Sequence, residues 1–72
     1  MSAAPDYSLI REEVADLLHR VAAHAGAASV HAQAGTDQMM AAELRCCAAT
    51  LMSVSALVGE MRAVLQQGGR AA

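Results

Sequence analysis

The chain has 72 residues and a formal net charge of −2. It can therefore hold one domain at most, and it lacks the clustered positive charge that binding to a phosphate backbone requires. Its apolar fraction is 56%, but much of this is alanine, which buries little area, and Tyr7 is the single aromatic residue. Helix-forming residues dominate, so the composition favours an all-α fold and argues against nucleic acid as a partner.

The N-terminal residues contain neither a basic region nor an apolar run, so a signal peptide is not expected. The longest uncharged apolar run, residues 46–59, is shorter than the ~20 residues that cross a bilayer. Cys46 and Cys47 would point about 100° apart on a helix, so a disulfide between them is not expected. These features predict a cytoplasmic location, reduced thiols and no membrane partner.

Residues 1–7 are expected to form a flexible lead-in, because Pro5 permits only an extended or first-turn conformation. A first helix is predicted over about residues 8–33, where apolar or weakly polar residues recur at alternating spacings of four and three. This row consists of Ile10, Val14, Leu17, Val21, His24, Ala28 and His31. Gly35-Thr36-Asp37 predicts a turn over about residues 34–37, because glycine suits a left-handed C-cap and Thr36 or Asp37 suits the next N-cap.

A second helix is predicted over about residues 37–67, with residues 68–72 as a flexible tail after Gly68 and Gly69 interrupt it. Its apolar row is Met40, Leu44, Cys47, Leu51, Val54, Val58, Met61 and Leu65. A row sustained this long marks a coiled-coil-like helix packed lengthwise against another. The predicted core of an antiparallel hairpin is therefore this row together with Ile10, Val14, Leu17 and Val21 of the first helix. Paired residue numbers should sum to about 71 or 72, which places His24 opposite Cys47.

A two-helix hairpin leaves one side of each helix uncovered, so a partner protein or homodimerisation into a four-helix bundle is expected to complete the fold. The face opposite the second row carries alanine where charge is usual, at Ala42, Ala49, Ala56 and Ala63. Small residues there suit either a close helical partner or a plain solvent-facing helix. The predicted partner interface is Leu18, Met39, Ala49, Met52, Ala56, Leu57, Ala63 and Val64.

The chemistry-bearing residues are few. His24, His31 and Cys47 are candidate ligands for zinc or copper(I), since imidazole and thiolate suit these metals. Their spacing matches no dedicated motif, so no metal or other cofactor is predicted. The sequence contains no glycine-rich phosphate loop and no nucleophile elbow. An enzyme is therefore not expected.

The turn residues Gly35-Thr36-Asp37 and the helical positions Leu44, Leu51, Ser53, Ala56, Leu57 and Val58 carry a resemblance. Over roughly residues 9–65 the chain resembles the small bacterial co-chaperones of type III secretion needle proteins, the YscE/EscE type, which are helical hairpins of about this length. The resemblance implies a cytosolic co-chaperone that binds a helical-repeat (TPR-like) chaperone and keeps a needle subunit soluble before export.

Two other functions remain open. One is a structural or regulatory protein that forms a homodimeric four-helix bundle. The other is a bundle that senses metal or redox state through His24, His31, Cys46 and Cys47.

Overall fold

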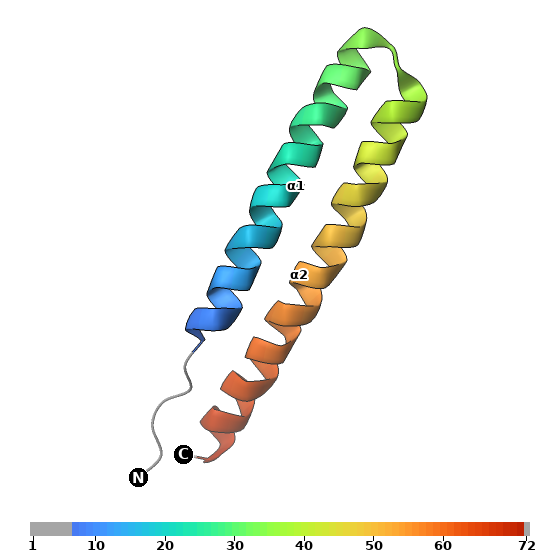
Figure 1. Ribbon diagram of the computed structural model, residues 1–72. Coiled ribbons are helices and arrows are strands. Elements are labelled where there is room, and N and C mark those ends of the chain that lie inside the picture. The colour runs from blue at the N-terminus through green and yellow to red at the C-terminus, as the bar shows by residue number, and fades with distance from the viewer. Residues whose placement is uncertain (1–6, 72) are drawn as a thin grey trace.

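The computed structural model describes the backbone of residues 7–71 and the side chains of residues 7–63. It contains two helices, α1 (Ser8–Ala34) and α2 (Asp37–Ala71), which run antiparallel beside each other (Figure 1). No strand is present in residues 7–71. The all-α helical hairpin predicted from the sequence is therefore confirmed.

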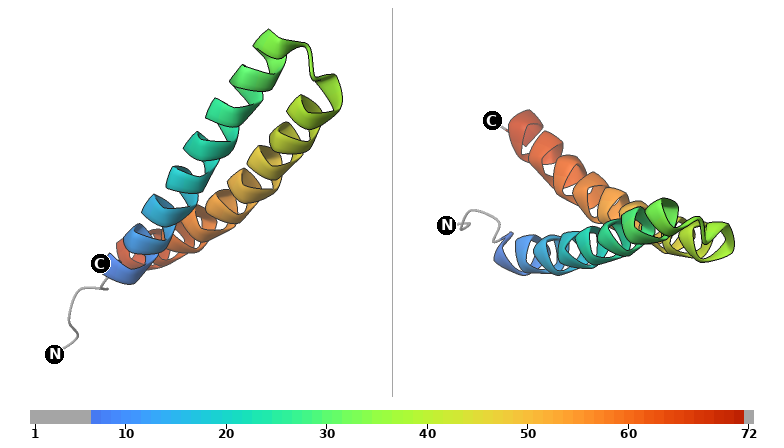
Figure 2. Two further views of the ribbon diagram at one scale, coloured as in Figure 1. Left: turned by 45° about the horizontal axis from the view of Figure 1, so that its top comes forward. Right: turned by 90° about the horizontal axis from the view of Figure 1, so that it is seen from above.

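The hairpin is a single layer of helices. Its principal extents are 58 × 17 × 12 Å and its radius of gyration is 17.1 Å, whereas a compact domain of this length has a radius of gyration of about 11 Å. Seen from above, the two helices lie closest near the turn and diverge toward the chain ends (Figure 2). Domains are normally built from at least two layers packed around a core, so each face of this layer lacks a covering element within the hairpin.

The turn is built around Gly35. Its φ of +75° is left-handed, and it ends α1 in a Schellman motif: the Gly35 N–H donates to the Ala32 carbonyl at 3.4 Å and the Thr36 N–H to the His31 carbonyl at 3.0 Å. The Thr36 carbonyl then accepts the first hydrogen bond of α2, from the Met40 N–H at 3.0 Å. Because one helix ends and the next begins within two residues, α2 folds back directly along α1.

On α1, burial follows the spacing of four and three. Ala28 is buried, and the other members of the row are half-buried, while charged residues such as Arg11, Glu12 and Asp16 are exposed. The half-buried members are Ile10, Val14, Leu17, Val21, His24 and His31. This side of α1 faces α2.

On α2, the structure differs from the predicted row. Met40, Cys47, Val54 and Met61 lie toward α1 as expected, but Leu44, Leu51 and Val58 are exposed. The positions one residue earlier face α1 instead, and they are Glu43, Thr50 and Leu57, all half-buried. With about 100° per residue, this choice rotates α2 by about 50° about its axis relative to the predicted orientation.

The pairing of the two helices along their length also differs from the prediction. Cys47 lies against Val21, whose carbonyl accepts a hydrogen bond from the thiol at 3.7 Å, and His24 contacts Glu43. These pairs sum to 68 and 67, below the expected 71 or 72. The observed pairs are displaced from the predicted ones by about four residues, close to one helical turn, so Glu43 and not Cys47 is the hydrogen-bond partner of His24.

Two further expectations concern the chain ends. Helix α2 continues through Gly68 and Gly69 to Ala71, beyond the predicted end at residue 67. Its backbone remains helical there because two glycines weaken a helix without blocking it as proline would. Residues 1–6 and 72, assigned to the flexible ends, lie outside the described residues, and the side chains of Val64 and Leu65 lie outside the described side chains.

Replacing glycine with alanine should have opposite effects at the turn and in the helix. A Cβ added at Gly35 or at Gly26 would meet no atom within 4 Å, so the backbone alone decides the outcome. Gly35→Ala should lower the free energy of unfolding by about 1 kcal/mol, because alanine is strained at positive φ. Gly26→Ala, in the middle of α1, should raise it by about 0.5–1 kcal/mol. Urea unfolding at matched protein concentration measures both, and a neutral Gly35→Ala would contradict the left-handed turn.

Candidate interaction surface

One feature of the surface is a row of large aliphatic side chains along α2. Leu44, Leu51 and Val58 are 50%, 46% and 38% exposed, and we call them the aliphatic stripe. They recur every seven residues, so they lie on one side of α2 over about 21 Å. Within the part of the chain that the structure describes, no element covers them.

The same side of the hairpin continues onto α1. Leu44 and Met40 line a shallow groove with Ala25, Ala28, Ser29 and Ala32 of α1. Leu18 precedes Ala25 by seven residues and so belongs to the same side of the helix, where it is exposed. The aliphatic stripe, the groove and Leu18 together form one apolar surface spanning both helices, which we call the apolar face.

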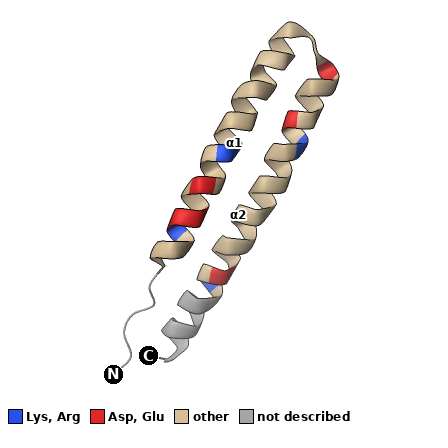
Figure 3. Cartoon of the chain, viewed as in Figure 1, with Lys and Arg blue, Asp and Glu red and all other residues tan. Residues whose placement is uncertain are grey.

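Charge is distributed around this surface rather than on it. Figure 3 shows charged residues in the first half of α1 and at intervals on α2, with a long uncharged stretch in the middle of α2. That stretch lies between Arg45 and Glu60 and contains Leu51 and Val58. Exposed apolar area bounded by charge in this way is typical of an interaction site.

The polar side chains between the helices have partners of their own. The ring Nδ1–H of His24 donates to the carboxylate of Glu43 at 2.5 Å, with side-chain exposures of 36% and 28%. The hydroxyl of Thr50 donates to the Cys46 carbonyl one turn back, at 2.9 Å. Glu43 and Thr50 are therefore satisfied in positions where an apolar residue would be expected.

Each of the three candidate metal ligands contacts a different group of the hairpin. His24 is paired with Glu43, Cys47 with the Val21 carbonyl, and the ring Nδ1–H of His31 donates to the Thr36 hydroxyl at 2.8 Å. Cys47 is buried and Cys46 is exposed, both as free thiols. Within the described residues, no group of three or more His, Cys, Asp or Glu residues is arranged to hold a metal ion.

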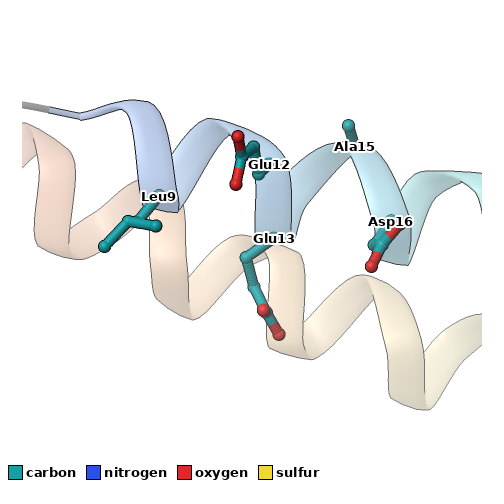
Figure 4. Close-up of a pocket in the computed structure, with 5 residues that line it drawn as sticks. All are labelled: Leu9, Glu12, Glu13, Ala15 and Asp16. Carbon is teal, nitrogen blue, oxygen red and sulfur yellow. The ribbon is translucent and has the colours of Figure 1, made fainter.

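An acidic depression lies near the start of α1. It is lined by Leu9, Glu12, Glu13, Ala15 and Asp16, all from this one helix (Figure 4). The three carboxylates point in different directions instead of converging on one position. Acid–base or metal chemistry needs groups that converge on a reacting atom or ion, so this arrangement is that of a solvated helix surface.

The residues predicted as a partner interface do not form one surface. Leu18 lies on the apolar face, whereas Met52, 73% exposed, follows Leu51 by one residue and points elsewhere. Leu57 is half-buried against α1, so its assignment to the interface is wrong. The remaining described members are exposed, namely Met39, Ala49, Ala56 and Ala63. The three residues of the aliphatic stripe were predicted to lie in the hairpin core, and the structure instead exposes them.

The chain matches no protein-family model, no curated protein and no solved structure.

By length and composition, the part of helix α2 between Asp37 and Ala63 is long and apolar enough to cross a membrane. Only 6% of its most apolar 18-residue stretch is buried in the hairpin. Such a helix alone is weak evidence for a membrane span. This stretch is longer than the uncharged run of residues 46–59 because it includes charged residues at its ends. The cytoplasmic location remains a prediction.

The contact between His24 and Glu43 should contribute little to stability. Because both side chains are partly exposed, a double-mutant cycle with His24→Ala and Glu43→Ala should give a coupling energy of about 0.2–1 kcal/mol at neutral pH. The same cycle with His19→Ala, an exposed histidine elsewhere on α1, should give a coupling near zero. Equal coupling in both cycles would contradict a direct contact.

Proposed function

We propose that this chain is a non-enzymatic protein–protein interaction module whose apolar face is covered by a helical partner. The observation that carries the proposal is the exposure of Leu44, Leu51 and Val58 in one continuous surface with the alanine-lined groove. Rows of aliphatic residues at helical spacing are recognised by helices that insert their own side chains between them. An active site has no comparable support, since the acidic residues of α1 do not converge.

The surface area of the chain supports the same proposal. The chain as a whole exposes 5514 Å², whereas a compact monomer of 7.4 kDa exposes about 4200 Å². The excess is about 1300 Å², and a stable interface buries about 800 Å² on each partner. One helical partner would therefore cover more than half of this excess.

More specifically, we propose a co-chaperone role of the kind that the resemblance implies. The hairpin would bind a helical-repeat chaperone through the apolar face, and together they would keep an aggregation-prone needle subunit soluble in the cytoplasm. The length of the chain, its two-helix form and its exposed apolar surface are compatible with this role. Leu44, Leu51 and Val58, three of the positions that carry the resemblance, also form the aliphatic stripe.

A homodimeric four-helix bundle would use the same surface. The metal- or redox-sensing bundle has weaker support, because His24, His31 and Cys47 each contact a different partner.

Site-specific photo-crosslinking tests the interaction function. A photoreactive phenylalanine analogue at Leu51 should give a covalent adduct with a helical partner protein in the native host, because this position is at the centre of the apolar face. The same analogue at Glu12, on the charged outer side of α1, is the matched control and should give at least about tenfold less adduct. Mass spectrometry identifies the adducts, and the identified partner is then mixed with purified wild type and with Leu51→Lys.

The possible results distinguish the general interaction function from the specific co-chaperone role. A helical-repeat protein that binds wild type but not Leu51→Lys supports the co-chaperone role, as does solubility of a needle subunit only when all three chains are co-expressed. Equal adducts at positions 51 and 12 would contradict the interaction function itself.

A further inference from the structure

We propose that the apolar face is covered by a second copy of this chain, packed face to face and antiparallel, so that two hairpins form a four-helix bundle with their turns at opposite ends. The proposal rests on the proposed interaction function and names its partner. A heterologous helical protein would then compete with the second copy for the same face.

The thickness and area of the hairpin are suited to a second copy. A layer 12 Å thick becomes a two-layer domain when one more layer of the same kind is added. The excess exposed area of about 1300 Å² per chain exceeds the ~800 Å² per partner that a stable dimer needs. One face-to-face contact between two copies therefore accounts for most of the excess.

The aliphatic stripe is self-complementary about its centre. Leu44 and Val58 lie seven residues to either side of Leu51. A two-fold axis perpendicular to α2 at Leu51 therefore brings the two Leu51 side chains together and pairs Leu44 of each copy with Val58 of the other. Such a contact is isologous and closes on itself, so association stops at a dimer.

Charges near the ends of the stripe favour the antiparallel arrangement. Asp37 precedes Leu44 by seven residues and Arg62 follows Val58 by four, so both lie on the same side of α2 as the stripe. They are about 21 Å and 16 Å from Leu51 along the axis, in opposite directions. Antiparallel packing brings Asp37 of each copy near Arg62 of the other. Packing with both turns at one end would place the two Arg62 side chains near each other.

A bilayer fits the same surface less well. Arg45 and Glu60 bound the uncharged part of α2, and they are about 22 Å apart along the helix, whereas the hydrocarbon core is ~30 Å thick. A spanning α2 would therefore hold at least one of these charges inside the hydrocarbon.

Sedimentation equilibrium of the full chain between about 1 and 100 μM tests the dimer. Wild type should reach twice its monomer mass of 7.4 kDa. Leu51→Lys should weaken association at least about 100-fold, because two ammonium groups would be buried together at the axis. Met52→Lys is the matched control: it adds the same charge one residue away on an exposed position, and it should change association by less than about threefold.

The arrangement of the two copies is tested by a distance between spin labels. Gln38→Cys, in a Cys46→Ser and Cys47→Ala background that still dimerises, places one label near each turn. Antiparallel packing should give about 40 Å between the labels, since each lies 13 residues from the axis. A distance of about 20 Å would mean that both turns lie at the same end and would overturn the antiparallel arrangement.

Circular dichroism on each variant keeps the test decisive. Loss of helicity in Leu51→Lys together with loss of the dimer, while Met52→Lys keeps both, supports the proposal, because folding and association are then linked through this face. A folded wild-type monomer at 100 μM would overturn it, as would equal disruption by the two lysine variants. Binding of wild type to phosphatidylcholine–phosphatidylglycerol vesicles in place of dimer formation would overturn it in favour of a lipid surface. A monomer that still gives the Leu51 adduct with a helical protein would refute the second copy while leaving the interaction function intact.

Discussion

The rotational orientation of α2 about its own axis is the constraint on which the rest of this structure depends. Helix α2 could pack on α1 in two orientations that share one row of inward-facing residues, Met40, Cys47, Val54 and Met61. This shared row lies between two further rows of α2, and only one of those two can also face α1. In the observed orientation the row of Glu43, Thr50 and Leu57 completes the contact with α1, and the row of Leu44, Leu51 and Val58 is left outside. The contact between His24 and Glu43 and the position of the apolar face both follow from this choice.

An isolated hairpin would bury more apolar area in the other orientation. The observed one places a carboxylate and a hydroxyl between the helices, and it is tolerated because Glu43 is paired with His24 and Thr50 bonds to its own helix. Helix α2 therefore has three adjacent rows with two roles. The rows of Cys47 and of Thr50 contact α1, and the row of Leu51 points out of the layer. A helix with an apolar surface this wide is characteristic of bundles, in which every helix touches two neighbours.

Much of the fold could be predicted from the sequence, and the part that failed has a specific physical cause. The helices and the turn follow from helix propensity, from a spacing of four and three on α1, and from Gly35, where only a residue free of Cβ strain adopts positive φ at little cost. The orientation of α2 could not be predicted, because rows 43–50–57 and 44–51–58 are both compatible with heptad spacing. Hydrophobicity favours the second row. The contact between His24 and Glu43, residues nineteen apart in sequence, favours the first, and it is visible only in three dimensions. The candidate site was therefore assigned to the core, although its residues had been identified.

The alanine content of the turn half has a further consequence for association. Ala25, Ala28 and Ala32 let α2 approach α1 closely near the turn, and their small side chains leave the groove beside Met40 and Leu44. A face made of small residues on one helix and aliphatic side chains on the other offers shape and apolar area but few hydrogen-bond donors or acceptors. Association through it should therefore be accompanied by a negative heat-capacity change and depend only weakly on salt, apart from Asp37 and Arg62 at its ends. Because such a face discriminates poorly between aliphatic partners, the choice of partner depends on the charges that surround it and on the concentrations of the competing chains.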